Sequence, residues 1–309
     1  MSASPYTVRN YRPSDYDNYV KFKTAAAKLP SGGESRTPEA IREILHRPGY
    51  CPEQDLLVAI ASGEIIGATE IVPELASDRV ILNYFILPEH GGQGLEELLL
   101  SQAVRRGKEL GAKAARVNVR QENTAAQRLL LELGFRKVKR YLELKLSLAG
   151  VEIPDTAAGT YSVEHLQPGD EEKLAQLQNR SFADNWEYNP NTAEEIAESL
   201  EQSRSLPEDV LLIYDAGKPV GYCWTKIEGV TGGKEEITGR IHMLGVDRDY
   251  RNRGLGRMAL FGGLSYLESR GVRIVELTVD SANASALTLY RSAGFKEWAS
   301  SLWYEKTID

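Results

Sequence analysis

The pattern of hydrophobic and polar residues along this chain occurs twice. Each half opens with a short strand and one or two amphipathic helices, followed by a hairpin that turns at SGE (62–64) or AGK (216–218). A strand, a glycine-rich turn, an amphipathic helix (96–110 or 257–270), a β-branched strand, a helix and a last strand complete each half. This order predicts an α/β fold with a mixed sheet and helices on both of its faces.

The repeat extends to individual residues. The stretch YTVRNYRPSD (6–15) reappears as YSVEHLQPGD (161–170), and Gly94, Asn123 and Phe135 each have an identical residue 160 positions later. Separate blocks that recur in the same order indicate a duplicated domain rather than a solenoid of short units.

Length and composition agree with two domains. The chain has 309 residues, of which 42% are hydrophobic and 26% are charged, as in soluble globular proteins. We predict one domain over residues 1–148 and a second over 160–309. The small residues, proline and glycine of 149–159 predict a linker between them.

Charge and cysteine content exclude several classes of protein. The net charge of −7 argues against nucleic-acid binding and is compatible with a cationic acceptor. The two cysteines, Cys51 and Cys223, predict neither a disulfide framework nor a metal site, and Cys223 lies in a strand where packing is expected. Without a membrane-spanning apolar run or a signal-peptide core at the N-terminus, a cytoplasmic protein is expected, as a monomer or a homodimer.

The stretch DRDYRNRGLGRM (247–258) concentrates arginines and glycines in an acidic chain. Unpaired amides at the start of a helix bind anions, and glycines allow a phosphate to approach the backbone closely. A solvated basic turn is the simpler alternative. The string GLGRMA also fits a dinucleotide fingerprint, although Glu276 lies in the middle of its strand rather than at the end.

A second motif follows at NASALTLYRSAGF (283–295). Together with R-x-x-G-x-G at 251–256, it resembles the GCN5-related N-acetyltransferase (GNAT) family, and the whole chain is similar in plan to its tandem members. The resemblance implies two tandem GNAT domains, each with a mostly antiparallel sheet, and acetyl-CoA as co-substrate. It implies these cofactor-binding residues: Leu244, Val246, Arg251, Arg253, Gly254, Leu255, Gly256, Arg257 and Asn283.

The same resemblance implies how the cofactor lies and what Tyr290 does. The pyrophosphate would bind the amides of 251–257, and the pantetheine would add like a strand beside Leu244 and Val246. The phenol of Tyr290 would protonate the leaving thiolate. The alternative for Tyr290 is an aromatic side chain packed on the inner face of its helix.

The proton-accepting base is less clear from the resemblance. Many family members use a glutamate six residues before the end of the strand, where this chain has Arg240. His242 lies two residues further on, and IHMLGV resembles the strand of arylalkylamine N-acetyltransferases whose histidine handles the proton through water. We therefore predict His242 as the base, with an interior strand residue as the alternative, and Glu235 and Glu236 in reserve.

An aromatic-rich stretch, NRSFADNWEYNPNT (179–192), lies between the first two helices of the second half. Exposed aromatic side chains on a loop suit a binding pocket, whereas a satellite core cluster is the alternative. The residues that we expect to contact the acceptor, with Glu187 as a further polar contact, are Phe182, Asn185, Trp186 and Tyr188.

The first half lacks much of this chemistry. The turn LPEHGGQGLEEL (87–98) has Glu96 and Glu97 in place of Gly256 and Arg257, and Leu130 stands in place of Tyr290. Carboxylates at the start of a helix repel a diphosphate and complement the helix dipole themselves. The first domain is therefore predicted to be a degenerate, non-catalytic copy, with weak CoA binding through its remaining glycines left open.

These observations predict an acetyl-CoA-dependent N-acetyltransferase. The C-terminal domain would transfer the acetyl group directly to a primary amine of a small molecule in a ternary complex. A non-catalytic acyl-CoA-binding scaffold is the main alternative, and binding of a nicotinamide dinucleotide is a second one.

Overall fold

The protein is described by a computed structural model, which covers residues 6–28, 37–47, 50–154, 160–185, 188–203, 205–230 and 237–308. It divides into two compact units, each built around its own six neighbouring strands of a twelve-stranded sheet. Unit 1 contains Met1–Arg140 and Ser301–Asp309, and unit 2 contains Tyr141–Ser300. Within the described residues, none of the helices has the length and apolar character that crossing a bilayer requires.

The sheet of unit 1 is antiparallel except for one parallel pair, β4 and β5. Helices α4 and α5 cover one of its faces, and α1 and α2 cover the other. Its strands, in spatial order, are β1 (Thr7–Asn10), β2 (Leu56–Ala61), β3 (Glu64–Glu74), β4 (Arg79–Ile86), β5 (Ala114–Arg120) and β12 (Lys296–Thr307). Its helices are α1 (Tyr16–Ala27), α2 (Pro38–Leu45), α3 (Pro52–Asp55), α4 (Leu95–Glu109) and α5 (Thr124–Glu132).

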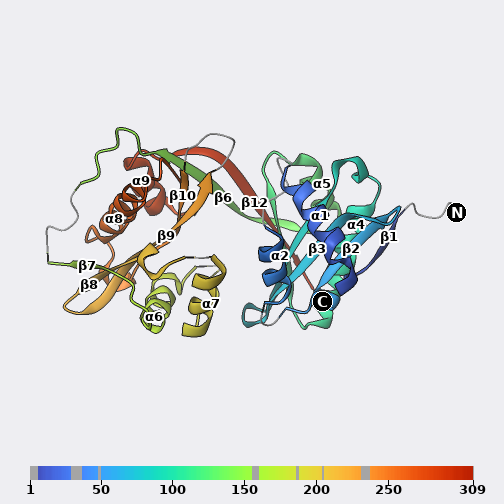
Figure 1. Ribbon diagram of the computed structural model, residues 1–309, viewed down its shortest axis with the longest axis horizontal. Coiled ribbons are helices and arrows are strands. Elements are labelled where there is room, and N and C mark those ends of the chain that lie inside the picture. The colour runs from blue at the N-terminus through green and yellow to red at the C-terminus, as the bar shows by residue number, and fades with distance from the viewer. Residues whose placement is uncertain are drawn as a thin grey trace. The chain divides into compact units, whose positions relative to one another are not determined.

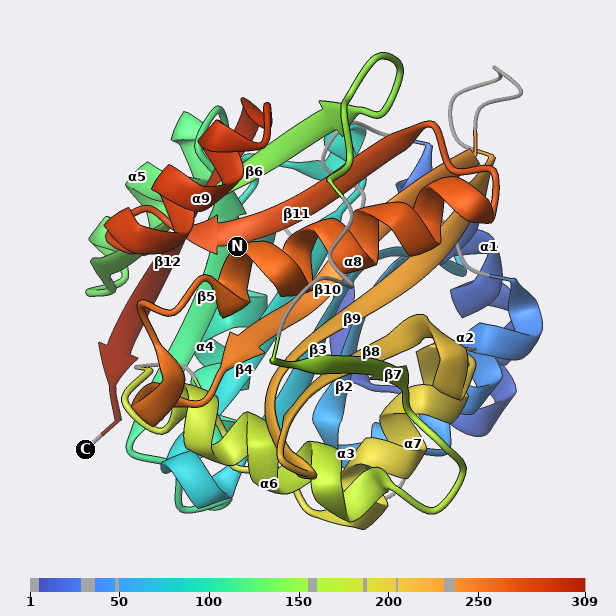
Figure 2. The same ribbon diagram turned by 90° about the vertical axis from the view of Figure 1, so that its left-hand side faces the viewer.

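Unit 2 repeats this arrangement, with β10 and β11 as the parallel pair. Helices α8 and α9 cover one face, and α6 and α7 cover the other (Figures 1 and 2). Its strands, in spatial order, are β6 (Arg136–Ser147), β11 (Ile274–Asp280), β10 (Ile237–Val246), β9 (Lys218–Val230), β8 (Val210–Asp215) and β7 (Ser162–His165). Its helices are α6 (Glu171–Phe182), α7 (Ala193–Ser203), α8 (Leu255–Ser269) and α9 (Ala284–Ser292).

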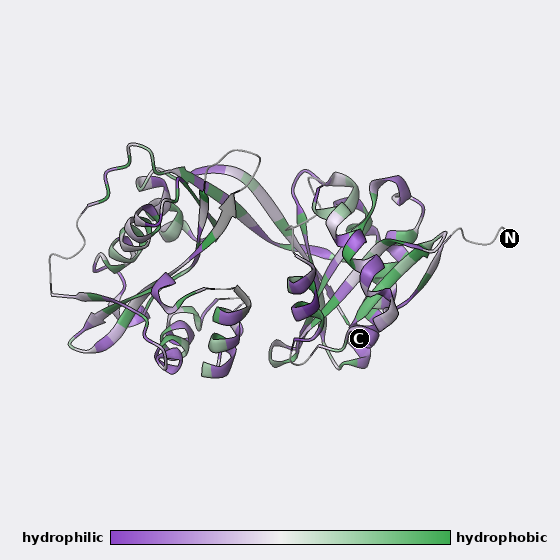
Figure 3. Cartoon of the chain, in the orientation of Figure 1, coloured by the Kyte–Doolittle hydropathy of each residue, from purple (hydrophilic) through white to green (hydrophobic). Residues whose placement is uncertain are grey.

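Hydrophobic and polar residues alternate along the strands, and this alternation produces the layers of helices and sheet. In β11, Val275, Leu277 and Val279 are buried in the core beneath α8, whereas Glu276 and Thr278 point to the opposite face. Figure 3 shows the same division, with hydrophobic residues along the central strands and hydrophilic residues on the outer sides of the helices. The predicted α/β class, with helices on both faces of a mixed and mostly antiparallel sheet, is confirmed in both units.

The compact units differ from the predicted domains at 1–148 and 160–309, because the last strands are exchanged. Residues Ser301–Thr307 of β12 pair with β5 in unit 1, and Tyr141–Ser147 of β6 pair with β11 in unit 2. Each sheet is thus completed by the other half of the sequence. Of the predicted linker, 149–154 forms no helix or strand, and 155–159 lie outside the described residues.

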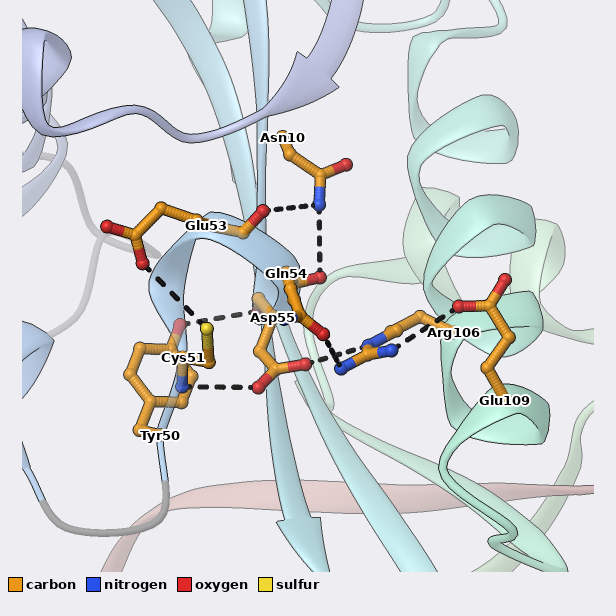
Figure 4. A network of polar contacts seen from close by, with 8 residues as sticks. All are labelled: Asn10, Tyr50, Cys51, Glu53, Gln54, Asp55, Arg106 and Glu109. Atoms are coloured by element: carbon orange, nitrogen blue, oxygen red, sulfur yellow. Dashed lines mark hydrogen bonds and ion pairs between the residues drawn. The ribbon is translucent and has the colours of Figure 1, made fainter.

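A buried aspartate fixes the long helix that follows the glycine turn in each unit. In unit 1, Asp55 is 3% exposed and accepts a hydrogen bond from Arg106 Nε of α4 at 2.9 Å and one from the Cys51 amide at 3.3 Å (Figure 4). In unit 2, Asp209 accepts one from the hydroxyl of Tyr266 of α8 at 2.8 Å. The partner differs, but both contacts hold the helix against the segment that precedes a central strand.

Candidate functional site

The strands β10 and β11 separate in the middle of unit 2. They pair only where Thr238 to Arg240 oppose Ile274 to Glu276. Beyond this point β10 pairs with β9 as far as Val246, and no described strand pairs with its other edge. The separation leaves an open stretch of strand edge.

The backbone of Leu244 and Val246 faces this open edge. The amide of Asp247 donates to the carbonyl of Val220 across the β9 pairing at 2.9 Å. Because hydrogen-bonded and non-hydrogen-bonded pairs alternate in an antiparallel ladder, the N–H and C=O groups of Leu244 and Val246 point away from β9. The side chains of both residues pack on the core beneath α8. An extended ligand could pair with this edge, as the sequence predicts.

The glycine-rich turn after β10 presents a row of backbone amides. Gly254 has φ +81° and ends the turn, and α8 begins at Leu255. The amides from Asn252 to Arg257 donate to no described residue, and the first helical bond nearby is from Met258 to the Gly254 carbonyl. An added Cβ at Gly256 would contact only Leu289, at 3.5 Å, so the approach to the amides is uncrowded. Such a row of donors at a helix start is an anion site.

The three predicted arginines differ in what they contact. The Arg251 guanidinium donates through Nη2 to the carbonyl of Ser181 in α6 at 2.7 Å. Arg253 donates to a carbonyl of its own turn and lies over the ring of Tyr250, and Arg257 lies over Phe261. All three arginines are exposed, so their positive charges are available to an anion that binds at the amides.

Asn283 serves as the N-cap of α9. Its side-chain oxygen accepts a hydrogen bond from the Ala286 amide at 3.0 Å, just as Asn123 does from Ala126 in unit 1. Its side-chain oxygen is therefore held by α9, whereas its amide nitrogen has no partner among the described residues and can reach a cofactor.

Tyr290 is fixed by the way α9 ends. Gly294 has φ +97°, and the amide of Phe295 donates to the Tyr290 carbonyl at 3.1 Å, which forms a Schellman motif. The ring of Phe295 packs edge-on against Tyr290, with centroids 5.9 Å apart. The ring of Tyr290 is 7% exposed, so it belongs to the core as its alternative interpretation holds.

The hydroxyl of Tyr290 is nevertheless available. It forms no hydrogen bond with a described residue and is not among the fully enclosed polar atoms. Burial raises the pKa of this phenol well above its ordinary value, with a smaller contribution from Cys223, the residue that pairs with Leu244. The phenol is therefore a protonated donor near the open edge of β10 at neutral pH.

His242 lies at an irregularity of β10. The pairing with β9 shifts between Ile241 and Met243, which makes His242 the extra residue of a bulge. It is exposed, and its ring packs edge-on against Trp224 at 5.1 Å, so it is not an interior strand residue. Arg240 donates to the Thr278 hydroxyl at 2.6 Å on the neighbouring strand.

Glu276 does not fit a dinucleotide fingerprint. It lies in the middle of β11, forms an ion pair with Lys145 at 2.8 Å and has Arg240 at 4.0 Å. A ribose-binding acid is expected at the end of its strand, with a free carboxylate.

The predicted acceptor residues divide into two groups. Phe182 stacks on Tyr188, with centroids 5.4 Å apart, and the Tyr188 hydroxyl donates to Asn179 at 2.6 Å, so these two form the predicted alternative of a small satellite core. Asn185 is exposed in the following turn. Trp186 and Glu187, together with the reserve bases Glu235 and Glu236, lie outside the described residues.

The corresponding turn of unit 1 is filled by its own carboxylate. Glu96 accepts a hydrogen bond from the Gly92 amide at 3.0 Å, and an added Cβ at Gly91 would lie 3.3 Å from the same carboxylate. Burial, with a contribution from Glu96, raises the pKa of Tyr84 to about 12. Leu130, the counterpart of Tyr290, is fully buried. An internal anion thus occupies the place where unit 2 offers free donors.

Unit 1 also has a cavity that sequence reasoning missed. It measures about 370 Å³ and is lined by residues in and beside α1, α2 and α3, among them Tyr11, Tyr16, Arg42, His46 and Glu53. None of the predicted site residues line it, and no pattern in the sequence marks it. Among the described residues no cluster of potential metal ligands occurs.

A family model described as the Acetyltransferase (GNAT) family matches residues 24–135 and 172–295. The chain belongs to this family. It is therefore an acyltransferase with acetyl-CoA as co-substrate, and the two matched regions agree with its tandem design. The amide row and the open strand edge of unit 2 fit such a thioester cofactor with its diphosphate and extended pantetheine.

Within the GNAT family, the chain is similar to mycothiol synthases, because several relatives are mycothiol acetyltransferases. The chain is 31% identical over 231 residues to a mycothiol acetyltransferase of Acidothermus cellulolyticus, which covers 72% of this chain and 69% of that one. It is also 31% identical over 221 residues to one of Thermobispora bispora, with 71% and 73% covered.

Solved structures share the fold along the whole chain. A GCN5-related N-acetyltransferase from Sphaerobacter thermophilus superimposes with a TM-score of 0.77 at 23% identity, covering 100% of this chain and 97% of that one. A tandem GNAT protein from the clavulanic acid biosynthesis pathway gives 0.69 at 14% identity, with 98% and 99% covered. At these identities the likeness establishes the fold alone.

Proposed function

We propose that unit 2 transfers the acetyl group of acetyl-CoA to a primary amine of a small molecule, and that unit 1 performs no catalysis. The observation that carries this proposal is the contrast between the two turns. Six consecutive amides, from Asn252 to Arg257, have no partner among the described residues, whereas Glu96 already occupies the turn of unit 1. A diphosphate needs donors without a negative charge beside them. In unit 1 the Glu96 carboxylate already accepts from the Gly92 amide and would repel the diphosphate.

The chain's own groups suit a direct transfer. Bound acetyl-CoA supplies an acetyl thioester, which the amine nitrogen attacks in a ternary complex as the carbon–sulfur bond breaks. Tyr290 is protonated at neutral pH, and its hydroxyl, which has no partner among the described residues, donates this proton to the departing sulfur. The phenol recovers a proton from solvent afterwards. No covalent acyl-enzyme is required, since Cys223 is fully buried and burial raises the pKa of its thiol to about 12.

His242 is the proposed acceptor of the proton that the amine loses. A protonated amine has no lone pair and must be deprotonated before it attacks. His242 is exposed on the bulge of β10, on the acceptor side, whereas Arg240 stands where many family members have a glutamate. Asn185 contributes polar contacts to the acceptor in this proposal, and Phe182 and Tyr188 form its rigid floor.

Steady-state thiol release tests the function. The purified chain is incubated with acetyl-CoA and a panel of small primary amines that includes the one acetylated by mycothiol acetyltransferases. We expect release of CoA that depends on one of the amines, with an acetylated product of matching mass. Saturable acetyl-CoA binding without amine-dependent release for any acceptor would instead support an acyl-CoA-binding scaffold. Thermal-shift titrations with acetyl-CoA and NADH distinguish the two cofactors.

A further inference from the structure

The glycine-rich turn of unit 2 is tied to the end of helix α6 by three contacts. Arg251 Nη2 donates to the Ser181 carbonyl at 2.7 Å, and Arg180 Nε donates to the buried carboxylate of Asp247 at 2.8 Å. Further out, Arg248 lies 3.6 Å from the Asp184 carboxylate. The first two contacts are partly buried, so they are more than exposed surface ion pairs.

The contact made by Arg251 satisfies a backbone carbonyl at the end of helix α6. Ser181 is in the last turn of α6, where backbone carbonyls have no helical partner and the helix dipole is negative. A guanidinium at this position satisfies the carbonyl and complements the dipole. Only Nη2 is used, so the remaining nitrogens of Arg251 have no partner among the described residues.

The end of α6 in turn borders the acceptor side of β10. A Cβ added at Gly245 would lie 2.9 Å from the Phe182 ring and 3.0 Å from Ser181 Cβ, so both side chains rest directly on this strand. The segment that leaves α6 carries Asn185 and Tyr188, two of the predicted acceptor residues. A change in the position of Ser181 would therefore move the acceptor side of the site.

We infer that Arg251 is a positioning residue that couples the two substrate sites. Its guanidinium binds the diphosphate of CoA through its free nitrogens while Nη2 keeps hold of the Ser181 carbonyl. Binding of the cofactor thereby orders the end of α6 and prepares the acceptor site. This inference rests on the proposed function, because it needs the diphosphate in the turn of unit 2.

The described residues of unit 1 show no such connection. The residues that correspond to Asp247, Arg248 and Arg251 are Leu87, Pro88 and Gly91, none of which carries a charge. The contact thus occurs in the unit whose turn is flanked by arginines, whereas the described turn of the other unit holds the carboxylate of Glu96.

Hydrogen–deuterium exchange of the full chain, with and without saturating CoA, tests the coupling. In the wild type, CoA should slow exchange at the amides of 252–257 and, about tenfold, at those of 179–185. Arg251→Lys keeps the charge but replaces the fork of separate guanidinium nitrogens, on which the two simultaneous contacts depend, with donors that all radiate from one atom. In this variant the turn should still be protected by CoA, whereas the end of α6 should exchange at the same rate with and without it.

Arg253→Lys is the matched control. Arg253 lies in the same turn but donates to Asp249 and does not reach α6. This variant should retain the wild-type response at 179–185. In kinetics, Arg251→Lys should raise the KM for the amine about fivefold, with the KM for acetyl-CoA changed less than twofold.

The outcomes separate the two proposals. Protection of 252–257 with no slowing at 179–185 in the wild type, or equal slowing in Arg251→Lys, would overturn the coupling and leave the function standing. An equal loss in the Arg253→Lys control would overturn it as well. If CoA protects none of the amides of 252–257, the proposed cofactor site is itself wrong.

Discussion

The turns at 91–97 and 251–257 have nearly the same backbone and opposite chemistry. Both end in a left-handed glycine, Gly94 with φ +79° and Gly254 with φ +81°, and both lead into a helix of 15 residues. In unit 2 the amides are free and flanked by arginines, whereas in unit 1 the carboxylate of Glu96 is bonded to one of them. The fold therefore preserves the shape of an anion site independently of whether an anion can bind.

The largest effect on acetyl-CoA binding is expected when a residue of the turn in unit 1 is copied into the turn of unit 2. Gly256→Glu should lower acetyl-CoA affinity between about fivefold and nearly a thousandfold, because a like-charge contact near 4 Å costs about 1 kcal/mol in water and about 4 kcal/mol at an effective dielectric of 20. Calorimetry measures the affinity. The new Cβ would lie 3.5 Å from Leu289, an ordinary van der Waals distance, so the helix should stay folded, which circular dichroism verifies. Unchanged affinity would place the diphosphate elsewhere.

The next largest effect is expected at Tyr290, which unit 1 replaces with a buried leucine. Tyr290→Phe should lower kcat about tenfold to a hundredfold with little change in acetyl-CoA affinity, a modest factor because a thiol is a fair leaving group. The raised pKa has a consequence for the pH profile. The phenol is protonated below its folded-state pKa, so kcat should show no alkaline loss attributable to Tyr290 up to about pH 10, the ordinary tyrosine value. An unaffected kcat in the variant would exclude the general-acid role.

A smaller effect is expected at His242, whose counterpart in unit 1 is Leu82. His242→Gln should lower kcat about fivefold near neutral pH, since an amide cannot accept the proton from the amine. His165→Gln is the matched control. His165 lies on β7, away from β10, and its ring is hydrogen-bonded to the carbonyl of Glu208. If both variants retain full kcat, water or another group accepts the proton.

The smallest effect is expected when the turn of unit 1 is given the residues of the turn of unit 2. In a chain that already carries Gly256→Glu, replacing Glu96 with glycine and Glu97 with arginine frees the Gly92 amide and adds a cation to the turn of unit 1. Weak CoA binding, with a Kd near the millimolar range, should then be detectable by ligand-observed NMR. Complete absence of binding would show that the turn is not the only part of the site that unit 1 has lost.

Much of the site was accessible from the sequence because it depends on local rules. The left-handed backbone at positions 254 and 294 favours glycine. The helix caps Asn123 and Asn283 each accept a hydrogen bond from the backbone amide three residues later. The alternation in β11 likewise predicts which residues are buried. Such features are fixed within a few residues, so a duplicated pattern shows them twice.

The features that were not predicted depend on contacts between distant residues. The partner of Arg251 is a carbonyl 70 residues away in α6, and a carbonyl leaves no mark in a sequence. The bulge at His242 is a mismatch between two strands and has no residue signature of its own. The exchange of β6 and β12 was missed for a related reason, because both last strands are preceded by the same Gly-Phe ending and suit either sheet.

That exchange gives a reason why the first half persists although we propose that it performs no catalysis. The sheet of unit 2 is completed by Tyr141–Ser147, which follow the first half directly in the sequence, and the sheet of unit 1 is completed by the C-terminal strand of the second. A gene shortened to either half would produce a protein with a missing strand and an exposed sheet edge, which invites aggregation. Under the proposed function, selection for acetyl transfer in unit 2 is therefore enough to retain unit 1, because the last strand of each sheet comes from the other half of the sequence.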